Sequence, residues 1–265
     1  MSIFNPFIFT YPLSIKVLYP FVLNTFNNNQ VKIRYYNPLT GQEVYANNDN
    51  KQKVKNTETN KIYSGSGVIF LERNFGTSTP TPTILLVITD NNIAEDIGGD
   101  LHKNIVVNKD ILASNAIKEV VEESQSLFII DKRNIEIIFN STNLFIDVEA
   151  PDNTYYRCYF VCITGTENSN LSDLFKQNKL KLNLKGPEFE ETNDIQRFFL
   201  TDILKCVNNN MNTCNNINGS EYTVRDRTIK IIKQLNNKWP DIKNIISSCQ
   251  SVSINNIDGV TQFKL

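Results

Sequence analysis

Residues 98–128 read "GGDLHKNIVVNKDILASNAIKEVVEESQSLF", and this stretch decides how the rest of the chain is interpreted. Near its end, Glu119, Glu122 and Glu123 stand close together, with Lys118 as their nearest counter-charge. Like charges three or four positions apart on a helix repel each other by about 0.2–0.5 kcal/mol per pair. This repulsion is unfavourable, and the cluster follows a predicted Gly-Gly turn. The acidic cluster therefore needs a physical explanation.

The stretch predicts a helix from Asp110, a favourable N-cap residue, to about Ser126. At about 100° per residue, the three glutamates fall within an arc of roughly 100°. Three apolar residues fall on the opposite side: Ile117, Val120 and Val121. One face of the helix is therefore expected in the core, and the other presents carboxylates.

Two interpretations of the acidic face are open. A solvated surface is the ordinary place for glutamates on a helix. Two features favour a metal site instead: position 123 repeats the negative charge of Glu119 where a lysine would be usual, and the helix follows "EDIGG" (95–99), directly after an apolar strand-like run. Clustered carboxylates suit Mg²⁺ or Mn²⁺, hard cations that prefer oxygen ligands and often bridge to phosphates.

The flanks of the helix predict strands. They are "SGSGVIFLER" (64–73), "TILLVITD" (83–90), "NIEIIFN" (134–140), "NLFIDVEA" (143–150) and "YYRCYFVCI" (155–163). A last amphipathic helix is expected from about Glu221 to Asn237. Strands on both sides of a helix indicate an α/β fold. We expect an N-terminal extension over residues 1–62 and one domain over 63–265.

Composition narrows the function classes. The chain has 265 residues and a net charge of −1, so no overall basic field favours non-specific nucleic-acid binding. Five cysteines without a CxxC pair predict reduced thiols and a cytoplasmic location. The apolar N-terminus lacks a basic start and a cleavage site, and Pro6, Pro12 and Pro20 would break a spanning helix. We therefore expect no membrane association.

The quoted stretch resembles the motif of the Nudix hydrolases, the MutT-like superfamily. That motif has a glycine, a spacer, Arg-Glu, two residues and Glu-Glu near a closing glycine. The matching residues here are Gly98, Gly99, Ala116, Lys118-Glu119 and Glu122-Glu123. The flanking strands and "EETNDIQRFFLTDIL" (190–204) also look like the family, so the resemblance covers about residues 62–205.

The sequence departs from the family pattern in four places. The earlier glutamate of the motif has no clear counterpart, and Asp110 is the nearest residue by count. Lys118 replaces the usual arginine, and Gln125 stands where the closing glycine would be. The loop "DLHKNIVVN" (100–108) lengthens the spacing after Gly99 by about five residues and carries His102, the single histidine, which we expect at the surface. The three glutamates remain, so the resemblance still implies metal binding.

The resemblance implies an α/β/α sandwich with a mixed sheet and hydrolysis of a diphosphate linked to another group, most often a nucleoside. Glu119, Glu122 and Glu123 would hold Mg²⁺ or Mn²⁺, with Glu119 or Glu123 as a possible base. Gly98 and Gly99 would shape the turn, and Lys118 would hold the acidic cluster by charge. In "EFEET" (188–192), Glu190 and Glu191 are further candidates for a base.

Substrate and partners stay open at this point. Capped RNA, dinucleoside polyphosphates, nucleotide sugars and diphosphoinositol phosphates all fit, and a viral or protist origin of the AT-rich composition would favour RNA decapping. The apolar N-terminal arm predicts a homodimer. The sequence contains no GxSxG or P-loop motif, and a lone histidine excludes HExxH chemistry. The rival hypothesis is a catalytically weak or inactive binding or assembly protein on the same fold.

Overall fold

The computed structural model of the chain describes residues 61–73, 82–101, 109–131, 144–183, 187–238, 242, 246–247 and 249–265. It also describes the backbone of four strands upstream: β1 (Thr25–Asn27), β2 (Gln30–Tyr36), β3 (Glu43–Asn47) and β4 (Val54–Lys55). Strands β1, β2 and β3 form an antiparallel sheet of their own. Strand β4 pairs with β5 of the main sheet, so part of the expected extension joins the domain. The boundary at residue 62 stays a prediction.

The remaining strands are β5 (Ile62–Glu72), β6 (Thr83–Thr89), β7 (Ile93–Glu95), β8 (Ile97–Asp100), β9 (Phe128–Ile129), β10 (Phe145–Glu149), β11 (Tyr155–Thr164), β12 (Thr192–Phe199), β13 (Thr213–Asn215), β14 (Glu221–Val224), β15 (Gln250–Ser251), β16 (Ser253–Ile257) and β17 (Val260–Lys264). The helices are η2 (Asp90–Asn92, a 3₁₀ turn), α2 (Lys109–Glu123), α4 (Leu171–Leu182), α5 (Pro187–Glu190), α6 (Leu200–Asn208) and α7 (Asp226–Asn237).

In the described part of the chain, the largest sheet follows the order β10-β11-β5-β6-β7-β14-β13. Strand β11 runs parallel to β5 and β14 runs parallel to β7, while β5, β6 and β7 pair antiparallel. Strand β8 also pairs with β5, and β12 also pairs with β6. The sheet is therefore mixed. Its central strands read as continuous apolar runs because both of their faces are buried.

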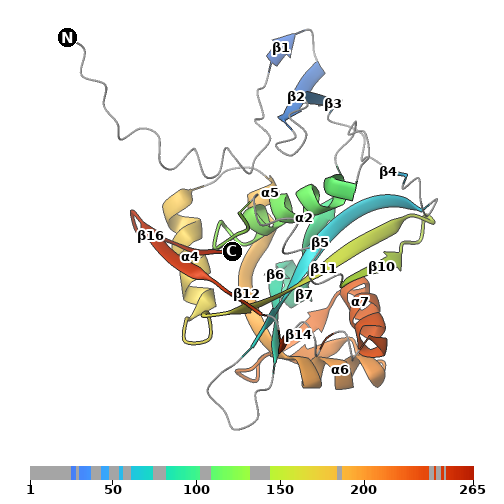
Figure 1. Cartoon of the computed structure of the whole chain (residues 1–265), viewed down its shortest axis with the longest axis vertical. Coiled ribbons are helices and arrows are strands. Elements are labelled where there is room, and N and C mark those ends of the chain that lie inside the picture. Colours follow the sequence, from blue (N-terminus) through green and yellow to red (C-terminus); the bar gives the residue numbers. More distant parts are fainter. Residues whose placement is uncertain are drawn as a thin grey trace.

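Helices cover both faces of this sheet (Figure 1). One core joins the sheet to α2 and α4, with Ala116 and Phe175 among its buried members. The other core joins the opposite face to α6 and α7, through residues such as Ile203 and Ile231. In Figure 1, α2 lies above the long strand β5, and α6 and α7 lie below it. The predicted α/β/α sandwich with a mixed sheet is confirmed.

The predicted elements hold with two corrections. Helix α2 ends at Glu123, earlier than expected, because Gln125 and Ser126 adopt left-handed φ values of 52° and 58°. The last helix begins at Asp226, because residues 221–224 form strand β14 and pair in parallel with β7. The β-branched Thr223 and Val224 suit a strand better than a helix. The strand expected at 134–140, the loop with His102 and the side chain of Asp110 lie outside the described residues.

The cysteines differ from expectation. Cys162 and Cys249 form a disulfide, so the prediction of reduced thiols is wrong for this pair. Strand β11 runs parallel to β15, and Ile163 pairs with Gln250. Cys162 and Cys249 come one residue before this pair, so they lie side by side. The other three are free: Cys158, Cys206 and Cys214. Disulfides persist mainly in oxidising compartments, so this bond weighs against the cytoplasmic location, which stays a prediction.

Within the described ranges, the structure contains no helix with the length and apolar character needed to span a bilayer.

Candidate functional site

The candidate site is built where strand β8 meets helix α2. Strand β8 pairs antiparallel with β5, which places Gly98 opposite Gly67 and Gly99 opposite Ser66. The hydroxyl of Ser66 donates to the carbonyl of Leu112 at 2.7 Å, and the Asn115 amide donates to the Ser66 hydroxyl at 3.2 Å. These bonds between β5 and the first turns of α2 fix the helix beside Gly98 and Gly99. The Gly-Gly turn expected from the sequence is wrong, because both glycines lie in strand β8 and neither has a positive φ.

Glu123 is held by the backbone of strand β8. The backbone N–H of Gly98 donates to Oε2 of Glu123 at 2.6 Å, and this carboxylate is 7% exposed. Among the described residues, Glu123 has no ion-pair partner. Burial raises the pKa of Glu123 well above its usual value, and the negative charges of Glu119 and Glu95 raise it further. The protein therefore keeps a carboxylate where its ionised form is poorly stabilised.

Glu119 lies against the second glycine. A Cβ added to Gly99 would stand 2.5 Å from Oε2 of Glu119, so any larger residue at this position would force the carboxylate to shift. Burial raises the pKa of Glu119, although the neighbouring Lys118 opposes the shift. The charge of Glu191 adds a smaller increase to the pKa of Glu119. Glu191 itself is exposed.

Glu122 has a different environment from the other two acids. Its Oε2 lies 2.8 Å from Nζ of Lys118, which also lies 3.5 Å from Oε1 of Glu119. Glu122 is 2% exposed, so Lys118 neutralises a buried carboxylate. Over the described residues, no three acidic, histidine or cysteine side chains gather closely enough to hold a metal ion by themselves. The structure thus brings Glu119 and Glu123 together beside Gly98 and Gly99 of strand β8 and pairs Glu122 with Lys118.

A second group of side chains contacts Gly98 from the other side of the sheet. The sequence did not reveal this group. Asp96 is fully buried and accepts from Tyr156 Oη at 2.6 Å, Thr228 Oγ1 at 2.8 Å and Arg227 Nε at 3.1 Å. Nη2 of Arg227 donates to the carbonyl oxygen of Gly98 at 3.2 Å. The guanidinium lies 4.2 Å from the centre of the Tyr156 ring, a cation–π contact.

The segment after α2 connects Glu191 to the site. Nε2 of Gln125 donates to the carbonyl of Phe189 at 2.7 Å, and Asn178 donates to the carbonyl of Gln125 at 3.3 Å. Gln125 has the left-handed backbone that glycine adopts most easily, at the position where the resembled motif closes with glycine. These bonds hold the strained backbone and anchor α5, which ends beside Glu191.

The donor chemistry of the Glu119–Glu123 pair fits a hard divalent cation. Mg²⁺ commonly takes one or two protein carboxylates and completes its shell with water and substrate phosphates. A bound cation would relieve the repulsion between the two buried carboxylates. The two carboxylates can therefore serve as ligands of such a cation. The charge of Glu191 raises the pKa of one of them, Glu119.

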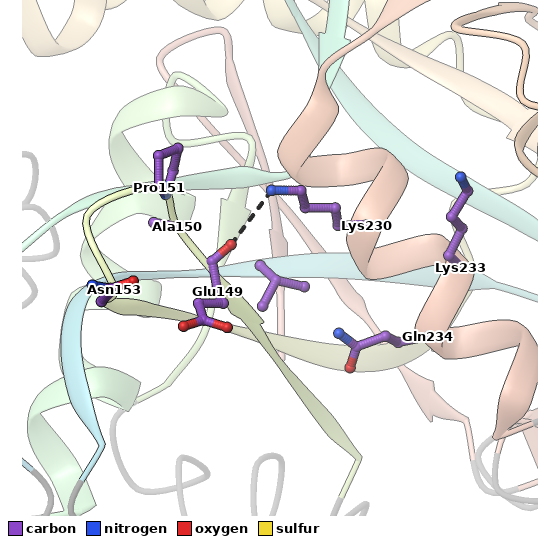
Figure 2. Close-up of a pocket in the computed structure, with 8 residues that line it drawn as sticks. Glu149, Ala150, Pro151, Asn153, Lys230, Lys233 and Gln234 are labelled. Carbon is purple, nitrogen blue, oxygen red and sulfur yellow. Dashed lines mark hydrogen bonds between the residues drawn. The ribbon is translucent and has the colours of Figure 1, made fainter.

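A separate depression lies on the opposite face of the sheet (Figure 2). It has a volume of about 640 Å³ and lies between α7 and the β10–β11 turn. Its lining includes Lys230 and Lys233, and Nζ of Lys230 donates to the carbonyl of Glu149 at 3.4 Å. Val148 in its wall belongs to the core shared with α6 and α7, whereas the carboxylate pair belongs to α2.

No protein-family model matches the chain, and no curated protein sequence matches it. Among solved structures, it is similar to a MutT/Nudix family protein from Listeria innocua, at 13% identity and a TM-score of 0.37, over 68% of this chain and 96% of the other. It is also similar to a Nudix hydrolase from Alicyclobacillus acidocaldarius, at 10% identity and a TM-score of 0.39, over 72% and 98%. These distant likenesses concern the fold alone, so the function has to come from the residues of the site.

Proposed function

We propose that the chain is a metal-dependent hydrolase that cleaves a diphosphate linkage in a substrate of the nucleoside-diphosphate type. The observation that carries the proposal is the Gly98 N–H bond to Glu123, beside a second buried carboxylate, Glu119. Two adjacent buried carboxylates lower the stability of the fold unless a cation or a proton neutralises their charge. Such raised pKa values are common at functional sites. The resemblance of 98–123 to the Nudix motif agrees with this placement.

In this proposal, Glu119 and Glu123 hold a Mg²⁺ or Mn²⁺ ion. Such an ion would neutralise phosphate charge and make a water molecule more acidic. Both carboxylates have raised pKa values, which also suits either one to accept a proton from the attacking water. Glu191 is the third candidate base, because it is exposed and close enough to raise the pKa of Glu119. Lys118 would hold the side chain of Glu122 in place.

The test is a hydrolysis panel with Mg²⁺ or Mn²⁺. Capped RNA, dinucleoside polyphosphates, nucleotide sugars and diphosphoinositol phosphates are incubated with the wild-type protein and with Glu123→Gln. The wild type is expected to hydrolyse at least one substrate, and the variant to slow that reaction by about 10²–10⁴-fold, as loss of a catalytic acid–base group does. Glu221→Gln makes the same chemical change on an exposed strand and should leave the rate unchanged.

A binding or assembly protein without useful activity is the second candidate. It is favoured by Lys118, whose single positive charge already lies 2.8 Å from Glu122 and 3.5 Å from Glu119, and by the lack of a three-carboxylate group in the described residues. Under this alternative, wild type and Glu123→Gln behave alike and independently of metal in the same panel.

A further inference from the structure

Gly98 is held from two sides by residues far apart in the sequence. Its N–H donates to Glu123, and its carbonyl accepts from Arg227, 129 residues further along the chain. Arg227 belongs to the first turn of α7, which packs on the face of the sheet opposite α2. Gly98 of strand β8 therefore links a residue of α2 to a residue of α7, beside the carboxylate pair.

Arg227 is itself fixed in direction. Its Nε bonds Asp96 at 3.1 Å, its Nη2 reaches Glu95 at 3.5 Å, and its plane lies over the Tyr156 ring. Asp96 is in turn held by the Tyr156 hydroxyl at 2.6 Å and by Thr228 at 2.8 Å. A planar guanidinium donates in several directions at once, which a single ammonium group does not reproduce. These contacts direct Nη2 of Arg227 toward the carbonyl oxygen of Gly98.

The space around Gly98 also depends on this arrangement. A Cβ at Gly98 or at Gly67 would collide with the hydroxyl of Tyr156, so this ring fills the room beside both glycines. The ring that supports Arg227 thus packs against the backbone that holds Glu123. A shift of Arg227 would remove one donor from the carbonyl of Gly98 and loosen the backbone residue whose N–H bonds Glu123.

We propose that Arg227 is a positioning residue, which fixes Gly98 so that its N–H keeps the Glu123 carboxylate beside Glu119. The inference rests on the proposed function for its catalytic consequence, but its structural part does not. Groups that bond to metal ligands from outside typically change metal affinity or activity by about 10–100-fold when they are removed. We assign Arg227 that effect, transmitted through one backbone residue.

The experiment compares Arg227→Lys and Arg227→Met with Arg225→Met. Arg225 also pairs with Glu95 but is half exposed and does not contact Gly98, so it is the matched control. Three properties are measured on the full chain: the Mn²⁺ dissociation constant by electron paramagnetic resonance, the hydrogen-exchange rate of the Gly98 amide by NMR, and the steady-state kinetics (kcat and KM) for any substrate found. Arg227→Lys keeps a positive charge beside the buried Asp96, so it stays informative where Arg227→Met does not fold.

Both Arg227 variants are expected to weaken Mn²⁺ binding and lower kcat by about 10–100-fold, with KM changed by less than about threefold. The Gly98 amide should exchange about tenfold faster or more, and Arg225→Met should leave all three properties within about twofold. A folded Arg227→Lys protein with wild-type exchange at Gly98 overturns the inference, and so does an equal effect of Arg225→Met. If the wild type neither binds Mn²⁺ nor hydrolyses a substrate, the proposed function fails, while the exchange rate still decides the role of Arg227.

Discussion

Replacing Glu123 with glutamine should make the metal-free protein more stable while removing its activity. Glutamine has almost the same shape, and its side-chain oxygen can still accept the N–H of Gly98. The change replaces a charged acceptor by a neutral one, which costs about 1 kcal/mol. It removes a buried negative charge, whose effective desolvation penalty is on the order of several kcal/mol. It also removes repulsion from Glu119 and Glu95. We expect a net gain of about 1–3 kcal/mol in the free energy of unfolding.

The gain should depend on pH with a defined sign. The pKa of Glu123 is raised in the folded protein above the ordinary glutamate value of 4.5. Below that value the carboxyl is protonated in both the folded and the unfolded state, so the two proteins differ little through this group. As pH rises above 4.5, the unfolded state releases its proton first, and the wild-type protein loses stability until the folded group also ionises. The advantage of Glu123→Gln therefore grows from pH 4.5 upward.

Urea unfolding followed by circular dichroism measures this effect, with EDTA present at pH 4 and pH 8. Glu221→Gln, on an exposed strand, should stay within about 0.5 kcal/mol of wild type at both pH values. With Mn²⁺ at 100 times its dissociation constant, the wild type should gain about 2.7 kcal/mol and the variant much less. A Glu123→Gln protein that is less stable than wild type at pH 8 in EDTA would refute the reasoning.

Other contacts lead to three further predictions. Gly99→Ala places a Cβ 2.5 Å from a carboxylate oxygen of Glu119, so it should weaken Mn²⁺ binding about tenfold or more and cost about 1–3 kcal/mol of stability, measured by calorimetric titration and urea unfolding. Arg197→Met removes the cation that lies 2.6 Å from the fully buried Glu72, and should lower the free energy of unfolding by about 3–5 kcal/mol without changing the Mn²⁺ affinity of the folded protein. We also propose that the N-terminal region mediates a homodimer, so light scattering should give the mass of a dimer for the full chain and the mass of a monomer after removal of residues 1–62; a truncated chain that is still a dimer rejects it.

The local parts of the site can be predicted from the sequence because they depend on periodicity. The pattern predicts the end of helix α2 to within three residues, and strand β6 matches the apolar run almost residue for residue. The sequence gives less indication that Glu122 is separated from Glu119 and Glu123. The spacing of four between Lys118 and Glu122 is the available signal, since such pairs meet on a helix, and the structure uses it for an ion pair.

The supporting group cannot be predicted, because it is assembled by long-range packing. The Asp96–Arg227 bond joins residues 131 positions apart, and no local pattern shows that the first turn of α7 reaches the end of β7. The predicted start of α7 is itself wrong, since residues 221–224 complete a strand whose partner, β7, lies far away in the sequence. The one available hint is the Glu95-Asp96 pair directly after an apolar strand, where buried charges need partners.

Anomalous scattering from a crystal soaked in Mn²⁺ tests the central claim most directly, because it locates the ion independently of any substrate. We expect a peak within coordination distance of the Glu119 and Glu123 carboxylates, beside Gly98 and Gly99 of strand β8, and no peak there in Glu123→Gln. A wild-type crystal with no peak at this position under saturating Mn²⁺ would contradict the claim.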